Sequence, residues 1–238
     1  MLLKELIKMA KIKFPKLICG ELIERKNRFV AEVKLSEKII TAYVPNPGRM
    51  EELMVPGTEV FVYHVSDKER KTDYNLSLVS YKDQLVSINS QLPNQLFLNA
   101  LEEQELAPYA AFNKIKAEHS YGDSRLDFYL PGRKEVLIEV KSVTLVEDRI
   151  AKFPDAPTKR GRRHLSELIK AVKDGYRAGV NFVIQRSDVD KFKPHQRIDL
   201  EFAEKLKAAK EAGVEVYAWS CEVNLTEIEL LEEIAVEL

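Results

Sequence analysis

Cysteine and histidine are scarce in this chain, and neither is spaced as in a metal site. There are two cysteines, Cys19 and Cys221, far apart in the sequence, and four histidines. No Cys-x-x-Cys or His-x-x-His pattern is present, which argues against a zinc site. We therefore interpret both cysteines as free thiols.

The chain also lacks a long hydrophobic run. Its first residues, Leu-Leu-Lys-Glu-Leu-Ile-Lys, are interrupted by charge too often for a signal peptide, and no segment is long enough to span a membrane. We expect a soluble, cytoplasmic protein with no membrane partner. With 238 residues and 45% hydrophobic content, the chain can bury one large core or two modest ones.

An excess of charge of one sign is absent as well. The formal net charge is -1, so the composition does not by itself indicate a nucleic-acid-binding protein. The distribution is uneven, however. Residues 1–82 carry 15 Lys and Arg against 11 Asp and Glu, whereas residues 83–238 carry 22 against 27. Six of those acids lie in the tail from Glu222 to Glu237, so basic patches remain elsewhere in the second part.

The first eighty residues predict a small β-barrel. After a short predicted helix at residues 2–10, β-like runs follow one another with turn residues between them. The predicted strands are residues 17–23, 29–35, 39–44, 59–65 and 75–81. This spacing favours an oligonucleotide/oligosaccharide-binding (OB) barrel, although another small barrel would show much the same pattern. The rigid turn Asn-Pro-Gly before Arg49 presents that arginine as a nucleic-acid contact or as a solvated turn residue.

Beyond this barrel the pattern changes to helices alternating with buried strands. We place the domain boundary near residue 83, with the barrel in residues 1–82 and the second domain in residues 83–238. Predicted helices cover residues 93–106, 159–174 and 199–211, and predicted strands cover residues 115–121, 180–185 and 214–221. This alternation predicts an α/β sandwich built on one mixed sheet. The fold class is therefore α+β with two domains.

Residues 124–145 predict a β-hairpin with charged side chains on one face. The apolar faces are Leu126, Phe128 and Leu130 in the first strand, and Val136, Ile138 and Val140 in the second. A Pro-Gly turn sets a register in which Asp127 lies opposite Glu139, and Arg125 opposite Lys141. Glu139 and Lys141 are two residues apart and point the same way. Asp127 and Glu139 can share a divalent cation; the alternative is an ordinary solvated face.

These side chains suit metal-assisted phosphodiester hydrolysis. Asp127 and Glu139 would hold Mg²⁺ or Mn²⁺, which polarises the phosphoryl oxygen and lowers the pKa of the attacking water. Lys141 would position that water or stabilise the developing charge. A third carboxylate is common in such sites. Glu118 on the preceding strand, or Glu102 or Glu103 on the helix before it, could serve, and the sequence does not choose between them; Glu118 is included in our predicted metal site. Weaker candidates near the same segments are His119, His164 and Gln185.

A basic cluster surrounds the start of the helix that follows the hairpin, where Thr158 is the expected N-cap. Its members are Lys152, Lys159, Arg160, Arg162 and Arg163. A helix N-terminus attracts phosphate through its free N–H groups and its dipole, so basic residues there indicate a phosphate-bearing ligand. Our nucleic-acid contacts are Arg49, Arg125, Lys159, Arg160, Arg162 and Arg163. The alternative is a solvated basic face paired with the acidic tail.

Four motifs in this chain resemble the sugar fermentation stimulation protein A (SfsA) family. They are Pro-Asn-Pro-Gly-Arg-Met at 45–50, Ser-Arg-Leu-Asp-Phe at 124–128, Ile-Glu-Val-Lys-Ser-Val-Thr-Leu at 138–145, and Phe-Pro-Asp-Ala-Pro-Thr at 153–158 with Gly161 and His164-Leu165 after it. The resemblance covers nearly the whole chain. It implies an OB-like first domain and a second domain similar to the PD-(D/E)xK nucleases.

In the pattern of that nuclease superfamily the Asp maps on Asp127 and the Glu-x-Lys on Glu139 and Lys141, with Leu126 in place of the proline. The SfsA family is generally described as DNA-binding and linked to regulation of sugar metabolism. The resemblance therefore bears on fold and partner more than on the reaction.

The leading interpretation is a DNA-binding protein whose second domain is a Mg²⁺-dependent nuclease acting on DNA or a related phosphodiester, RNA included. One alternative is a non-catalytic, DNA-binding transcriptional regulator that uses the nuclease fold as a scaffold, although no helix-turn-helix pattern supports it. Another is a sugar- or nucleotide-binding module, whose binding would be insensitive to salt. The sequence does not fix the oligomeric state; because nucleases of this type often cut both strands as dimers, a homodimer is one expectation.

Overall fold

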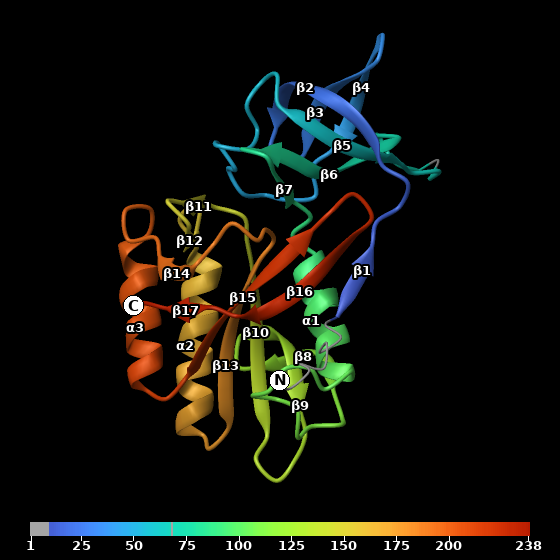
Figure 1. Ribbon diagram of the computed structural model, residues 1–238. Coiled ribbons are helices and arrows are strands. Elements are labelled where there is room, and N and C mark those ends of the chain that lie inside the picture. Colours follow the sequence, from blue (N-terminus) through green and yellow to red (C-terminus); the bar gives the residue numbers. More distant parts are fainter. Residues whose placement is uncertain (1–9, 68) are drawn as a thin grey trace, which may run out of the picture.

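The computed structural model of the chain describes residues 10–67 and 69–238, and it places them in two domains (Figure 1). A barrel sits above a layered α/β domain, and the short strand β1 (Lys11–Lys13) joins the edge of the α/β sheet before the chain enters the barrel. The predicted helix at residues 2–10 lies, apart from Ala10, outside the described residues. None of the helices in the described ranges is long and apolar enough to cross a membrane.

The first domain is a closed barrel, as predicted, and all five expected strands are present. They are β2 (Ile18–Asn27), β3 (Val30–Leu35), β4 (Lys38–Tyr43), β5 (Glu59–His64) and β6 (Tyr74–Tyr81). Neighbouring strands follow the order β4-β3-β2-β5-β6, and a parallel pairing of β4 with β6 closes the ring. The short strand β7 (Gln84–Ser87) adds to β6, so the expected boundary at residue 83 falls between these two strands.

Alternating side chains fill the barrel. Leu22, Val33 and Leu76 come from three different strands and are fully buried inside it. Gly20 lies where β2 passes closely over β3, since an added Cβ would come within 2.7 Å of a Val33 methyl carbon. A residue without a side chain is therefore needed at that crossing.

The second domain is built on one mixed sheet, which confirms the predicted class. Its strand order is β1-β16-β15-β13-β10-β9-β8. The strands not yet introduced are β8 (Lys116–Tyr121), β9 (Ser124–Leu130), β10 (Val136–Val143), β13 (Arg177–Ile184), β15 (Glu215–Val223) and β16 (Glu227–Glu233). The central strands β10, β13 and β15 are parallel, and their outer neighbours are antiparallel. The nearly continuous apolar run of β13 is typical of a parallel strand buried on both faces.

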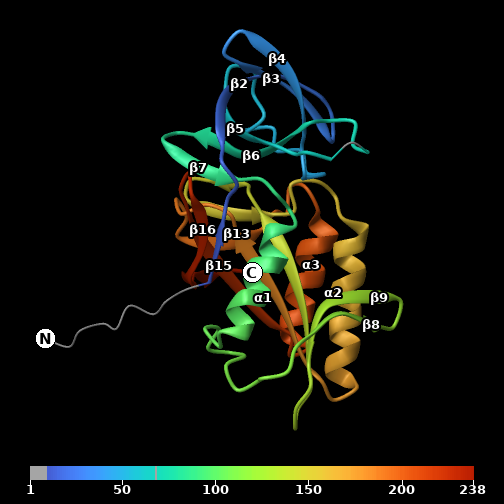
Figure 2. The ribbon, with the colours of Figure 1, turned by 90° about the vertical axis from the view of Figure 1, so that its right-hand side faces the viewer.

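Helices cover both faces of this sheet. α1 (Leu92–Glu102) packs on one face, and α2 (Lys159–Lys173) and α3 (Leu200–Glu211) pack on the other (Figures 1 and 2). Thr158 caps α2 as predicted, because its hydroxyl accepts the Gly161 N–H at 3.0 Å. α2 ends before Gly175, whose φ of +96° suits the left-handed position that follows many helices.

A small four-stranded sheet, which the sequence pattern did not predict, lies on the side of the α/β domain nearest the barrel (Figure 1). It consists of β11 (Val146–Glu147), β12 (Ile150–Phe153), β14 (Lys191–Pro194) and β17 (Ala235–Val236). Direct contacts join the two domains. The Ser87 hydroxyl donates to Gln185 Oε1 at 2.8 Å, and the buried Arg186 guanidinium lies 5.0 Å from the centre of the Tyr81 ring.

Candidate functional site

Between Val136 and Ile138 the β9–β10 hairpin has the register predicted from the sequence, but the predicted pairs Asp127–Glu139 and Arg125–Lys141 are not part of the ladder. Phe128 pairs with Ile138, and Leu130 with Val136. The ladder of paired residues ends at Phe128. The residue before it, Asp127, bonds to β10 through its side chain instead of its backbone. Asp127 Oδ2 accepts the Val140 N–H at 2.7 Å. This contact brings the Asp127 carboxylate beside the strand that carries Glu139 and Lys141.

β9 changes direction at Asp127, and here one prediction was wrong. Leu126 packs in the core on the α2 side of the sheet, whereas Phe128 and Leu130 pack in the core on the α1 side. The three side chains therefore do not share a face. On the neighbouring strand, Glu118 has a positive φ of 58° at the position facing Asp127. This irregular backbone accompanies the turn of β9 away from β10.

Glu139 is the centre of the site. It is 2% exposed, and its Oε1 contacts both the Lys141 ammonium and His164 Nδ1. Arg160 Nε donates to His164 Nε2 at 3.2 Å, so Nε2 is the accepting nitrogen and Nδ1 carries the proton donated to Glu139. The other carboxylate oxygen, Glu139 Oε2, is buried and has no hydrogen-bond partner among the described residues.

The electrostatic balance keeps Glu139 ionised despite its burial. Burial alone would raise the pKa of Glu139, but the charge of Lys141 and the hydrogen bond from His164 hold it below its usual value. Asp127 responds in the opposite way. Burial, together with the negative charge of Glu139, raises the pKa of Asp127 to about 6, against the opposing effect of the Val140 N–H. The site therefore holds two carboxylates that repel each other and one lysine.

Asn94 completes the surroundings of Asp127. It lies in the first turn of α1, and its Nδ2 donates to Asp127 Oδ1 at 2.6 Å. Sequence reasoning missed this residue, because nothing local distinguishes an asparagine near the start of a helix from an ordinary polar residue. It also ranked His164 only as a weak candidate, although His164 is 1% exposed and contacts Glu139 directly.

The donor set fits a hard divalent cation such as Mg²⁺ or Mn²⁺. Mg²⁺ is commonly held by one or two carboxylates and keeps several water ligands. Asp127 and Glu139 supply the carboxylates, and the buried Glu139 Oε2 has no other partner. In the described ranges no three His, Cys, Asp or Glu side chains gather in a group that could hold a metal, so water would have to complete the coordination.

Glu118 does not join this site, which corrects the prediction of a third carboxylate ligand. Its carboxylate forms an ion pair with Arg125 on the neighbouring strand, and the two side chains are 66% and 60% exposed. The positive φ of Glu118 sets its backbone apart from the rest of the strand. Arg125 is likewise paired on this exposed edge rather than standing beside Lys141.

The basic residues of α2 fall into two groups. Arg162 Nη1 lies 2.7 Å from the buried carboxylate of Asp199, the N-cap of α3, so this arginine joins two helices. Its assignment as a nucleic-acid contact stays a prediction, with a structural role as the alternative. Arg160 points toward the site through its hydrogen bond to His164. Lys159 and Arg163 are exposed, and neither takes part in an ion pair within the described residues.

Two weaker candidates are structural. Gln185 is fully buried; its Nε2 donates to Ser142 Oγ at 3.0 Å while its Oε1 accepts from Ser87, so it ties the barrel to β10. His119 stacks on Tyr129 with ring centres 4.4 Å apart, at the outer edge of the sheet. Glu102 and Glu103 are exposed at the end of α1.

The loop at residues 45–50 is held rigidly, and this explains its turn residues. The Arg25 guanidinium donates to the carbonyl oxygens of Arg28, Asn46 and Gly48. Gly48 lies so close to Asp155 of the second domain that an added Cβ would collide with that carboxylate. The two loops at 45–50 and 153–158 therefore meet, and they line a cavity of about 360 Å³ that also reaches Ser142, the residue after Lys141.

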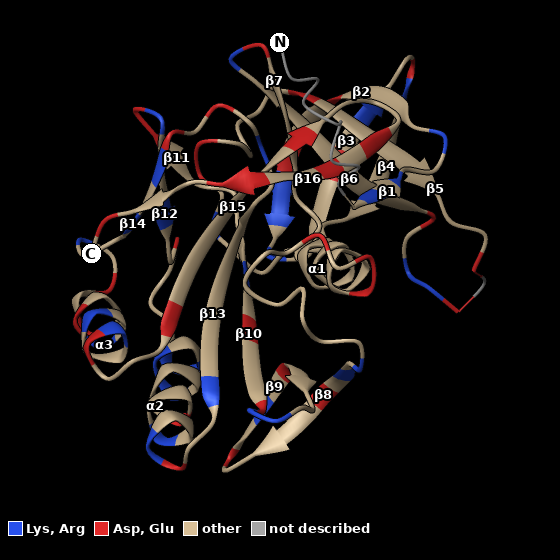
Figure 3. Cartoon of the chain, turned by 60° about the horizontal axis from the view of Figure 1, so that its bottom comes forward, with Lys and Arg blue, Asp and Glu red and all other residues tan. Residues whose placement is uncertain are grey.

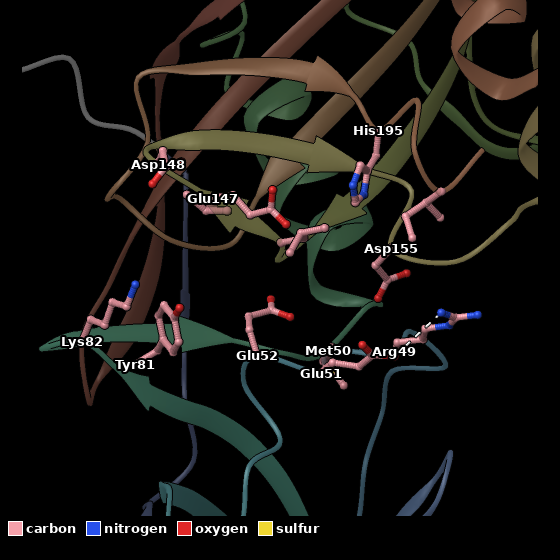
Figure 4. A pocket seen from close by; sticks show the side chains of 13 residues that line it. Arg49, Met50, Glu51, Glu52, Tyr81, Lys82, Glu147, Asp148, Asp155 and His195 are labelled. Carbon is pink, nitrogen blue, oxygen red and sulfur yellow. Dashed lines mark ion pairs between the residues drawn. The ribbon is translucent and has the colours of Figure 1, made fainter. Parts of the chain in front are cut away.

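A second cavity, of about 480 Å³, lies between the domains on the far side of this contact (Figure 4). Its acidic lining is Glu51, Glu52, Glu147, Asp148 and Asp155. Arg49 also lines this cavity. Its Nη1 lies 3.7 Å from Glu51 Oε1, and its side chain is more than half exposed. Burial raises the pKa of Glu52. So many carboxylates disfavour a polyanion at this opening.

The chain thus consists of an OB barrel and a mixed-sheet α/β domain whose central hairpin carries a buried Asp-Glu-Lys site. Comparison with known proteins places it. The family model described as the SfsA N-terminal OB domain matches residues 23–88, and the one described as the sugar fermentation stimulation protein RE domain matches residues 91–227. The chain belongs to the sugar fermentation stimulation protein (SfsA) family.

Individual relatives agree with this assignment. A sugar fermentation stimulation protein homolog from Desulforamulus reducens is 46% identical over 228 residues, which cover 95% of each chain. A homolog from Clostridium kluyveri is 43% identical over 93% of this chain and 97% of its own. Among solved structures, Pyrococcus furiosus SfsA in complex with Ca²⁺ matches with a TM-score of 0.90 and 35% identity, over 97% of this chain and all of that one.

Proposed function

We propose that this protein binds nucleic acid and hydrolyses its phosphodiester bonds at a divalent-cation site formed by Asp127 and Glu139, with chemistry of the PD-(D/E)xK nuclease type. One observation carries the proposal. Glu139 is held through one oxygen by Lys141 and His164, while its other oxygen is buried and has no partner in the part of the chain that the structure describes. A buried carboxylate oxygen without a partner is costly unless a ligand occupies it.

The roles of the residues follow from these contacts. A bound Mg²⁺ would act as a Lewis acid on the phosphoryl oxygen and lower the pKa of a coordinated water. Asp127 and Glu139 would hold the cation, Glu139 through Oε2. Lys141, fixed by its ion pair with Glu139, orients the attacking water or stabilises the extra negative charge on the phosphoryl group. The water oxygen bonds to phosphorus, one ester P–O bond breaks, and the proton passes through solvent to the leaving oxygen, which gives a phosphomonoester and a hydroxyl.

Two further observations support the proposal. Pyrococcus furiosus SfsA, which is 35% identical, was solved in complex with Ca²⁺, a hard cation that takes oxygen ligands. The start of α2 also carries Lys159, Arg160 and Arg163, of which Arg160 is linked to Glu139 through His164, and Figure 3 shows basic residues along this helix. These cations suit the phosphates on either side of the cleaved bond.

A cleavage assay tests the proposal. Purified protein is incubated with end-labelled DNAs and RNAs, single- and double-stranded, in Mg²⁺, Mn²⁺ or EDTA. We expect cleavage with either metal and none in EDTA. Glu139→Ala and Lys141→Ala should each lose at least about a hundredfold in rate.

Lys207→Ala is the matched control, because Lys207 is exposed on α3 and has no ion pair in the described part of the chain. It should cut at the wild-type rate. Salt-sensitive binding of DNA without cleavage, whatever the metal, would contradict hydrolysis and leave a DNA-binding regulator. Salt-insensitive binding of sugars alone would contradict the nucleic-acid partner as well.

A further inference from the structure

The barrel carries a groove that differs from every other cavity described above in its chemistry. It has a volume of about 550 Å³ and runs from the end of β4 to the residues just before α1. Its lining includes two tyrosines and two cations, Tyr43, Tyr63, Arg70 and Lys71, and no Asp or Glu. The interdomain cavity of Figure 4, by contrast, is lined by five acids.

An aromatic platform adjoins this groove through Tyr43, which lines it. The Phe29 ring stacks on Tyr43 with an interplanar angle of 17° and a centroid distance of 6.3 Å. Phe29 is 42% exposed, which is unusual for so large an apolar side chain on a barrel with a complete core. Exposed aromatic faces are what unpaired bases stack on, whereas the bases of a duplex offer no free face.

Cations accompany the platform. The Arg70 guanidinium lies 5.4 Å from the centre of the Tyr43 ring and donates to Asn75 Oδ1 at 2.6 Å. Asn75 in turn donates to the Tyr63 hydroxyl at 2.6 Å, so the position of Arg70 is fixed by the groove itself. Neither Arg70 nor Lys71 takes part in an ion pair in the described ranges, which leaves their charges available to phosphates.

The groove leads toward the Glu139 site. Gln91, which lines the groove, directly precedes α1, and Asn94 in the first turn of α1 contacts Asp127. On the other side, Pro45 lines the groove, and its carbonyl oxygen accepts a hydrogen bond from the Ser90 hydroxyl. Ser90 in turn lines the neighbouring cavity, which Ser142 also lines. Figure 2 shows the barrel seated over the end of the sheet toward which β10 runs.

We propose that this groove binds single-stranded nucleic acid, with a base stacked on the Phe29–Tyr43 platform and phosphates on Arg70 and Lys71, and that it leads the strand to the Glu139 site. The last clause rests on the proposed hydrolysis; the binding does not. A single strand is the occupant because the platform needs an unpaired base. The two cations favour a polyanion over a neutral sugar chain.

Binding is measured in EDTA, so that no cleavage interferes, by fluorescence anisotropy with a labelled single-stranded DNA, an RNA of the same sequence and the matched DNA duplex. We expect the single strands to bind at least about tenfold more tightly than the duplex. Phe29→Ala should weaken single-strand binding by about tenfold, since one stacked base is lost. Arg70→Ala should weaken it and reduce the slope of log affinity against log salt by about 0.7.

The matched controls lie on the same barrel, outside the groove. Ile39, on β4, is 62% exposed, and Ile39→Ala removes an exposed apolar side chain; Lys38→Ala removes an exposed cation. Both should bind as the wild type does, and circular dichroism should show all variants folded. Failure of the wild type to bind single strands, equal binding of duplex, or equal losses in Ile39→Ala and Phe29→Ala would overturn the proposal. Binding that follows the prediction without any cleavage would support the groove and contradict only the hydrolysis.

Discussion

The two domains hold their functional side chains in opposite settings. In the α/β domain the side chains of Glu139 and Lys141 are 3% and 12% exposed, and each has a partner. On the barrel, Phe29 is 42% exposed and Arg70 lies along an open groove. Buried charges interact strongly but must be paired, whereas an exposed ring is available to any base that reaches it. Under the two proposals above, the α/β domain performs the chemistry and the barrel binds the strand.

If this division is right, each part can be damaged without the other. Substitutions at the buried site should change metal binding and cleavage while leaving the grip on a single strand intact. Substitutions on the barrel should weaken the binding of a single strand while leaving metal binding and the cleavage step intact.

Glu139→Gln should lower the affinity for Mn²⁺ by about a hundredfold, because a neutral amide is a poor ligand for a hard cation. Isothermal titration calorimetry of the folded protein measures this. Glu204→Gln, on the exposed side of α3, is the matched control and should bind Mn²⁺ normally. Single-strand binding in EDTA should be the same for both variants. Equal Mn²⁺ affinity in the two would place the cation elsewhere.

The stability of the metal-free protein should depend on pH through Asp127. Its pKa is raised to about 6, so ionising it costs the folded state free energy. The stability that the folded protein has with Asp127 protonated is fully present below about pH 4 and is lost as the pH rises through 6. The loss is up to about 3 kcal/mol, at roughly 1.4 kcal/mol for each pKa unit.

Urea denaturation in EDTA between about pH 4 and pH 8 measures this loss as the difference between the wild type and Asp127→Asn. The variant should gain on the wild type as the pH rises, and added Mg²⁺ should cancel the gain by stabilising the wild type alone. If the free energy of unfolding changed with pH in the same way for both proteins, the ionisation of Asp127 would not be what destabilises the folded state.

Two arginines on α2 should behave differently, although they are two residues apart. Arg162→Ala removes the ion pair to the buried Asp199 carboxylate and should cost about 2 kcal/mol of stability without weakening strand binding. Arg160→Ala removes the hydrogen bond to the buried His164 and should cost only about 1 kcal/mol, but it should weaken binding severalfold. Denaturation and anisotropy on both variants check this. Reversed results would mean that Arg162 faces the nucleic acid.

The smallest effect is expected at the contact between the domains. Ser87→Ala leaves Gln185 Oε1 without its donor and should cost about 1 kcal/mol of stability. Cleavage and strand binding should both persist, because Ser87 belongs to neither the site nor the groove. Denaturation beside Ser66→Ala, an exposed control, measures the difference. A loss of cleavage in Ser87→Ala would show that the catalytic site depends on this contact.

Features set by local chemistry could be predicted from the sequence. The register of the hairpin follows from the alternation of apolar residues and the Pro-Gly turn. The same alternation predicts that Glu139 and Lys141 point the same way, and in the structure Glu139 contacts His164 of α2. The start of α2 follows from the capping preference of Thr158. These signals lie within a few residues of the structure they determine.

Features set by contacts between distant parts of the chain could not be predicted from the sequence. Asn94 reaches Asp127 from 33 residues away, and only the packing of α1 decides that. The different partners of Arg160 and Arg162 depend on where α3 lies beside α2, which no local pattern records. The prediction that Glu118 is a metal ligand failed because of the backbone, since the positive φ of Glu118 accompanies the turn of β9. The two-domain class was predictable, whereas the ligand set was predictable only in part.

The most direct test of the division of labour is single-turnover cleavage by Lys141→Met beside the wild type. A labelled single strand is supplied with Mg²⁺ at protein concentrations where anisotropy shows both proteins saturating the strand. The account predicts that both bind alike and that the variant cuts at least about a hundredfold more slowly, because only the charge beside Glu139 is lost. Equal cleavage by the two proteins would contradict it and remove the Asp127, Glu139 and Lys141 site from the reaction.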